Sequence, residues 1–108
     1  MSFLTKFFSK PKLQEPFLGD WVIDKNAPDS LKELGYVKMS FKKDGSLIYE
    51  IREKDKSQFI LMTYLVEGDK LITDQASHPH KEETDFDFEN PTTLILKFNG
   101  VVTRFVKS

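Results

Sequence analysis

The sequence contains no cysteine among its 108 residues. Disulfide bridges, thiolate metal sites and cysteine nucleophiles are therefore excluded. A chain of this length fits one domain and has no room for two ordinary ones. About two thirds of the surface of such a chain is buried on folding, so we expect a single hydrophobic core without covalent cross-links.

An excess of charge is also missing, since 16 basic residues face 17 acidic ones and the formal net charge is −1. Nucleic-acid-binding domains are normally basic, so no nucleic acid partner is expected. No apolar run approaches the ~18 residues that span a membrane. Lys6, Lys10 and Lys12 fall among and after the first apolar residues, whereas a secretory signal places its charges before them. We therefore expect a cytoplasmic protein.

Catalytic motifs are absent as well. The sequence holds no Gly-x-Ser-x-Gly elbow, no phosphate loop and no dinucleotide fingerprint. Asp85, Asp87 and Glu89 alternate along one predicted strand, which is typical of the solvated side of a sheet. The sequence predicts neither an enzyme nor a bound cofactor.

The N-terminal segment has helical rather than strand periodicity. Phe3, Leu4, Phe7 and Phe8 share one side of a predicted two-turn amphipathic helix over Ser2–Lys10, which Pro11 ends. Lys12–Pro16 is predicted to be a linker. Residues 1–16 are thus predicted as helix and linker, and residues 17–108 as the folded domain.

Apolar and polar residues alternate from Phe17 onward, apart from a predicted helical turn between Asn26 and Gly35. Turn residues separate the alternating runs, and nothing else helical lies between them, so the strands are expected to pair in sequence order. The fold class expected is an all-β, eight-strand antiparallel up-and-down barrel behind the short N-terminal helix. The expected strands are Gly19–Asp24, Val37–Lys43, Ser46–Arg52, Phe59–Val66, Lys70–Gln75, Glu83–Glu89, Thr93–Phe98 and Val101–Lys107.

The turns fix which side chains face inward. A three-residue loop with Gly45 in the left-handed conformation pairs Met39 with Tyr49 and places only apolar residues on that face. A two-residue loop would shift the register by one residue and mix the faces. We therefore predict the longer loop.

Two further hairpins are read in the same way. Gly68-Asp69 predicts a two-residue turn that pairs Val66 with Leu71, and Asn99-Gly100 predicts one that pairs Leu94 with Phe105. The second register turns Arg104 outward, opposite Ile95.

One outer face of the predicted barrel is apolar, because Phe59, Leu61, Leu65 and Ile72 all point away from the interior. A contiguous exposed patch of this kind is usually covered or used. The helix over Ser2–Lys10 is the nearest cover. The same helix could instead lie on an anionic membrane surface or a partner, or exchange between two chains to form a homodimer.

The run Phe17-Leu18-Gly19-Asp20-Trp21 resembles the Gly-x-Trp start of the calycin superfamily, which includes lipocalins, fatty-acid-binding proteins and bacterial lipocalin-like proteins. In those families the tryptophan packs across one end of the barrel. The last hairpin, Asn99 to Arg104, resembles the end of fatty-acid-binding proteins, where an Arg-x-Tyr pair holds the ligand carboxylate. Here Phe105 and Val106 follow Arg104, so the tyrosine is missing. The resemblance implies a lipocalin-like barrel.

An eight-strand barrel is either filled by its side chains or holds one small ligand. The bulk of the predicted interior favours a packed core. The alternative is a small apolar pocket with Tyr49 and Tyr64 as polar handles. Its predicted ligand-binding residues are Trp21, Met39, Tyr49, Met62, Tyr64, Phe86 and Phe88.

His78 and His80 flank Pro79 in a predicted loop close to several carboxylates. Two histidines and a carboxylate are a ligand set for zinc, but the proline does not aim both rings at one point. Solvated loop histidines are the simpler interpretation, and no metal is expected.

Two main hypotheses for function remain open, and a third, an enzyme that works in the barrel mouth, would need a buried polar cluster that the sequence does not show. The first is a non-enzymatic, lipocalin-like domain that binds a small apolar molecule in the barrel. The second is a protein-interaction or dimerisation module with a filled core, which uses the outer apolar face or the N-terminal helix. A cavity below ~300 Å³ would favour the second.

Overall fold

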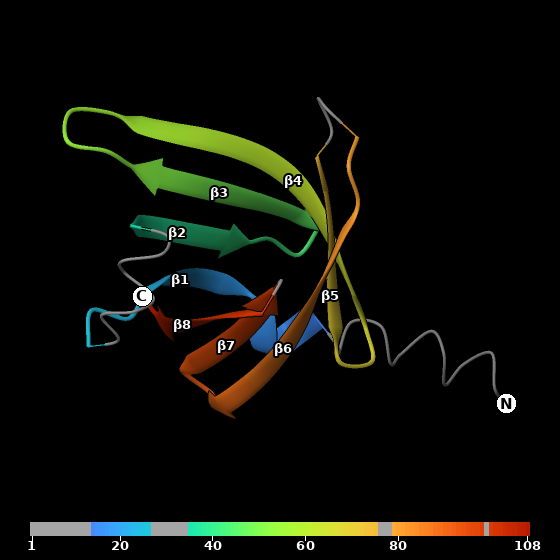
Figure 1. The fold of residues 1–108 in the computed structure, drawn as a ribbon. Helices are drawn as coiled ribbons and strands as arrows, with labels where there is room; N and C mark the ends of the chain where they lie inside the picture. Colours follow the sequence, from blue (N-terminus) through green and yellow to red (C-terminus); the bar gives the residue numbers. More distant parts are fainter. Residues whose placement is uncertain (1–13, 27–34, 76–78, 99) are drawn as a thin grey trace, which may run out of the picture.

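The computed structural model describes residues 14–26, 35–75, 79–98 and 100–108. A 3-10 turn, η1 (Glu15–Phe17), precedes eight antiparallel strands that pair in sequence order, and β1 pairs with β8 to close the barrel (Figure 1). The predicted all-β, up-and-down barrel is confirmed. The strands are β1 (Gly19–Ile23), β2 (Tyr36–Phe41), β3 (Ser46–Arg52), β4 (Ser57–Glu67), β5 (Lys70–Gln75), β6 (Glu82–Asn90), β7 (Thr93–Phe98) and β8 (Val101–Lys107).

The hairpin registers are also confirmed. Met39 pairs with Tyr49 across β2 and β3, and Gly45 in their connection has a φ of 90°. In the other two hairpins, Val66 pairs with Leu71 and Leu94 with Phe105. The apolar sides of the strands therefore face one interior, because a one-residue slip would have reversed them.

Strand β4 bends so that two neighbours share it. Its first part, Ser57 to Thr63, pairs with β3, and its last part, Met62 to Glu67, pairs with β5. The long strand thus carries the sheet around a corner, which closure of a small barrel requires.

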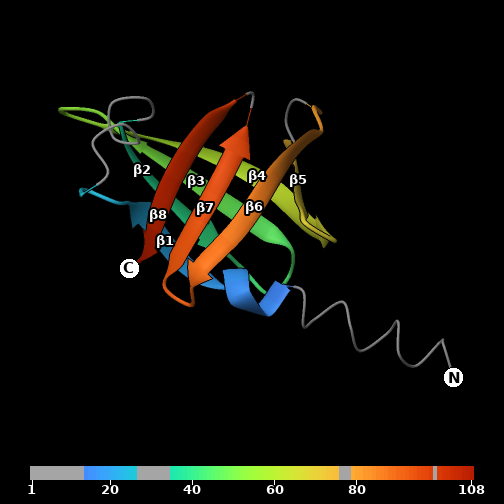
Figure 2. The same ribbon diagram turned by 60° about the horizontal axis from the view of Figure 1, so that its bottom comes forward.

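One end of the barrel is filled by aromatic rings. The turn η1 lies across this end, beside the end of β6 (Figure 2). Phe17 is 0% exposed, and its ring centroid lies 5.3 Å from that of Phe41, 4.8 Å from that of Phe86 and 5.0 Å from that of Phe88. Trp21 is equally buried, and its indole Nε1 donates a hydrogen bond of 2.7 Å to the carbonyl oxygen of Phe17. We call this end the closed end.

The last residues of the predicted linker form a helical turn. Within Lys12–Pro16, Glu15 and Pro16 belong to η1. Proline at the start of a helical turn has the required φ and lacks only an N–H that would be unpaired there. The Leu18 N–H then donates to the Glu15 carbonyl oxygen at 3.2 Å and closes the turn.

Two predicted helical segments fall outside the part of the chain that the structure describes. These are the amphipathic helix over Ser2–Lys10 and most of the turn between Asn26 and Gly35. Within the described ranges the helical structure consists of η1 and the adjoining Gln14.

Candidate functional site

The other end of the barrel is hollow. A cavity of about 500 Å³ lies among residues of β2 to β8 and the β5–β6 connection. Its mouth is marked by exposed residues, among them Phe98, which is 39% exposed, and His80. The walls are mainly apolar, and their apolar residues are Met39, Leu47, Ile51, Ile60, Met62, Leu71, Leu96, Phe98, Val101 and Phe105.

The predicted ligand-binding residues divide between the two ends. Met39, Tyr49 and Met62 line the cavity. The rest of the predicted set belongs to the closed end, where Trp21, Phe86 and Phe88 pack around Phe17 and Tyr64 packs edge-on against Phe41. Alternation along a strand tells which side of the sheet a residue faces, but not how far along the barrel axis it lies.

The two interior tyrosines therefore have different surroundings. The Tyr64 hydroxyl donates to the carbonyl oxygen of Lys42 at 2.8 Å, so a protein partner already satisfies it. Tyr49 lies in the cavity wall, where burial and then the charge of Glu82 raise the pKa of its hydroxyl. Tyr49 consequently stays protonated at neutral pH and can donate a hydrogen bond.

Glu82 is a site residue that sequence reasoning missed. The strand was expected to begin at Glu83, with its acids outside, but β6 begins one residue earlier. Glu82 pairs with Thr73 and shares its side of the strand with Thr84, and all three line the cavity. The extra residue places one carboxylate on the inner side of the sheet at the mouth.

The connection between β5 and β6 forms the polar rim. The His80 N–H donates to Asp74 Oδ1 at 2.8 Å, and the ring Nε2 of His80 lies 3.3 Å from Glu82 Oε1. His78, the other weak metal candidate, lies outside the described residues. Among the residues that are described, no three side chains of ligating types gather as a metal site would need.

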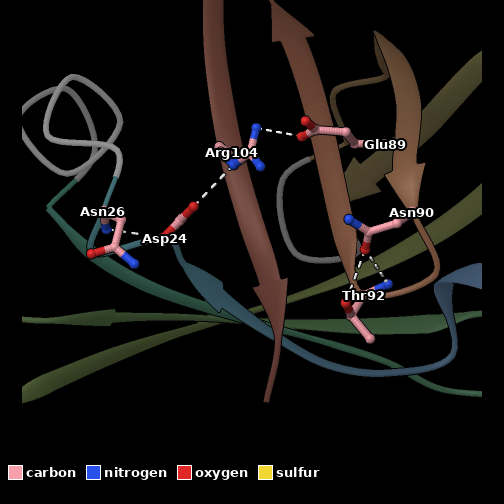
Figure 3. A network of polar contacts seen from close by, with 6 residues as sticks. All are labelled: Asp24, Asn26, Glu89, Asn90, Thr92 and Arg104. Carbon is pink, nitrogen blue, oxygen red and sulfur yellow. Dashed lines mark hydrogen bonds and ion pairs between the residues drawn. The ribbon is translucent and has the colours of Figure 1, made fainter.

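Arg104 lies on the outer surface of the barrel, as its register predicted. Its Nε donates to Asp24 Oδ2 at 2.9 Å, and its Nη1 pairs with Glu89 (Figure 3). Together these two ion pairs link the end of β1 to β6 across β7 and β8. Glu89 first and then Asp24 raise the pKa of the guanidinium. An arginine held in this way outside the barrel cannot hold a ligand carboxylate inside it.

The acids predicted on the outer side of β6 also lie there. Asp85 forms an ion pair with Lys70, and Glu89 pairs with Arg104. These carboxylates stabilise the outer surface rather than gather in a cleft.

The outer apolar face is present as predicted. Phe59 is 66% exposed, Leu61 59% and Leu65 46%, all on the outer side of β4, and Ile72 lies opposite Leu65 on β5. The segment expected to cover it, Ser2–Lys10, lies outside the described ranges, so that packing stays a prediction.

The fold and the cavity place the chain in the class of closed eight-strand up-and-down barrels with a hollow interior. No protein-family model, curated protein or solved structure matches the chain. In the part of the chain that the structure describes, no helix is long and apolar enough to cross a lipid bilayer.

Proposed function

We propose that the protein is a non-enzymatic, lipocalin-like carrier or receptor domain that binds one small, largely apolar molecule inside the barrel. The observation that carries this proposal is the cavity of about 500 Å³. Ligand sites commonly occupy about 300–1,000 Å³, whereas a core packed by its own side chains leaves few voids larger than a water molecule.

The distribution of polar groups supports binding by apolar contact. Aliphatic, methionine and aromatic side chains form most of the lining, together with three threonines, while Asp74, His80 and Glu82 come from the neighbouring parts of β5, β6 and their connection. Ligand sites typically combine such walls with a few polar groups that orient the bound molecule. The arrangement suits a ligand whose apolar body enters first and whose polar end remains near solvent.

The layout of the barrel supports the lipocalin-like assignment. Strand β1 begins with Gly19-Asp20-Trp21, and Trp21 packs across the closed end against Phe88. The resemblance to the calycin superfamily implies a tryptophan in that role. The end opposite the tryptophan is the one that holds the cavity.

A matched pair of variants tests the proposal. Leu96 lines the cavity and Lys97, the next residue on β7, is exposed. We expect the uncharged fluorescent probe N-phenyl-1-naphthylamine to bind the wild-type protein saturably at one site. Leu96→Trp should weaken this binding by about tenfold or more, equivalent to about 1.4 kcal/mol, because the larger indole ring would occupy cavity volume that the probe needs. Lys97→Trp should leave it unchanged.

Fluorescence titration gives the affinities, and circular dichroism verifies that both variants remain folded. Absence of saturable binding to the wild-type protein would contradict the proposal. Equal weakening by both variants would also contradict it, because the probe would then bind outside the cavity.

A further inference from the structure

The inward-facing charges are few and are unevenly placed. Glu82 shares the inner side of β6 with Thr84, Phe86 and Phe88, as the alternation of half-buried and exposed residues along the strand shows. Lys107 shares the side of Trp21, its partner across β1 and β8, but it lies at the closed end. There its Nζ is 4.8 Å from the Trp21 ring centroid and donates to the Leu18 carbonyl oxygen at 2.5 Å.

The cavity wall is therefore acidic. Its described lining includes the carboxylates of Asp74 and Glu82 but neither lysine nor arginine. The Asp74 carboxylate accepts a hydrogen bond from the backbone N–H of His80 and so ties the β5–β6 connection to the end of β5. Glu82 is the carboxylate on the inner side of the sheet, and its neighbour there is the exposed His80 ring, whose Nε2 lies 3.3 Å away.

Three basic residues around the barrel are paired with acids of the surface. Arg52 pairs with Glu50 at 3.2 Å, and Lys56 with Glu53 at 3.8 Å, both near the β3–β4 connection. Arg104 is held on the outer surface by Asp24 and Glu89. Arg52 and Lys56 are thus engaged by acids of their own hairpin.

Tyr49 faces the same cavity as Glu82. After burial, Glu82 is the second cause that raises the pKa of the Tyr49 hydroxyl. Both side chains line the same cavity, Tyr49 from β3 and Glu82 from β6. A polar ligand head at the mouth would thus meet a carboxylate acceptor and a neutral hydroxyl.

We propose that the ligand is an apolar molecule with a cationic amine head, and that Glu82 receives this head at the cavity mouth. This inference rests on the proposed function. A protonated amine would form a charge-assisted hydrogen bond with Glu82, in competition with the exposed His80 ring. A fatty acid would instead place a second carboxylate beside Glu82, and like charges at close range repel.

Three ten-carbon probes with different heads test this specificity. Decylamine, decanol and decanoate, each kept monomeric, are titrated at pH 7.5 against bound N-phenyl-1-naphthylamine. We expect decylamine to bind tightest and decanoate weakest, with the amine favoured over the acid by about tenfold or more, the effect of one charge-assisted hydrogen bond.

Glu82→Gln and Glu83→Gln form a matched pair, because they change the net charge equally at adjacent positions of β6. Glu83 pairs with Ile72 on the outer side of the sheet. Glu82→Gln should remove most of the preference for decylamine while the affinity for decanol stays the same. Glu83→Gln should keep the wild-type preference.

The outcomes separate this inference from the proposed function. If decanol and decanoate bind as tightly as decylamine, or if Glu82→Gln leaves the preference unchanged, the amine specificity is wrong and the carrier function stands. Equal loss of preference in both variants would show that overall charge, and not Glu82, attracts the amine. If neither the fluorescent probe nor any ten-carbon compound binds, the proposed function itself fails.

Discussion

Phe17→Ala is expected to lower the free energy of unfolding by about 3–5 kcal/mol, the usual cost of removing a fully buried phenylalanine side chain. The ring of Phe17 fills the closed end, where it contacts the rings of Phe41, Phe86 and Phe88. Domains of this size are commonly stable by only about 5–15 kcal/mol, so a large share of the stability depends on this one side chain.

The measurement is urea denaturation followed by the fluorescence of Trp21, the single tryptophan of the chain. Its indole N–H bonds to the backbone carbonyl of Phe17, which the alanine variant keeps, so the experiment isolates the contribution of the ring. Phe17→Leu is the control and should cost below about 1.5 kcal/mol because most of the buried volume remains. A loss below about 1 kcal/mol in the alanine variant would mean that the ring does not seal this end.

The second large effect is expected at Gly45. Its φ of 90° is a conformation that β-branched residues essentially never adopt, so Gly45→Val should destabilise the protein by roughly 2 kcal/mol. A Cβ built at this position would approach only the Tyr64 carbonyl oxygen, at 3.9 Å, which is ordinary contact. The cost is therefore conformational rather than steric.

Two backbone hydrogen bonds of Gly45 hold the loop in this conformation. Gly45 donates its N–H to the Lys42 carbonyl oxygen at 3.2 Å and accepts the Tyr64 N–H at 2.9 Å. Relaxing φ would break contacts both within the hairpin and to β4. Gly45→Asn is the matched variant, because asparagine tolerates positive φ better than valine does. Equal stability of the valine and asparagine variants in the same urea titration would contradict the account of this turn.

Strand positions and registers could be predicted because they depend on local patterns. The period-two alternation from Val37 to Phe41, together with the single glycine in the following loop, leaves one register that gathers the apolar residues. The Asn99-Gly100 turn likewise fixed the outward direction of Arg104, which its outer ion pairs confirm.

The position of a residue along the barrel axis could not be predicted in the same way. Tyr49 and Tyr64 both face inward, yet one lines the cavity and the other belongs to the closed end. The difference depends on how strands of unequal length are staggered, and on where η1 inserts Phe17. That ring comes from the first residue of the predicted folded domain, and no pattern there indicates a turn that carries it across one end of the barrel.

The inward position of Glu82 could not be predicted from the sequence either. Sequence patterns define the middle of a strand more sharply than its ends, and neighbouring residues of a strand face opposite sides of the sheet. A strand that begins at Glu83, as predicted, has all of its acidic side chains on the outer side of the sheet. The actual start at Glu82 introduces the carboxylate on which the inferred ligand specificity depends.

The three methionines allow the central claim to be measured directly. Met39 and Met62 line the cavity, while Met1 lies at the chain terminus. In protein labelled with ¹³C at the methionine methyl groups, titration with decylamine or N-phenyl-1-naphthylamine is expected to shift the Met39 and Met62 signals together and saturably. Unchanged Met39 and Met62 signals under saturating probe, or a shift confined to Met1, would contradict a ligand site inside the barrel.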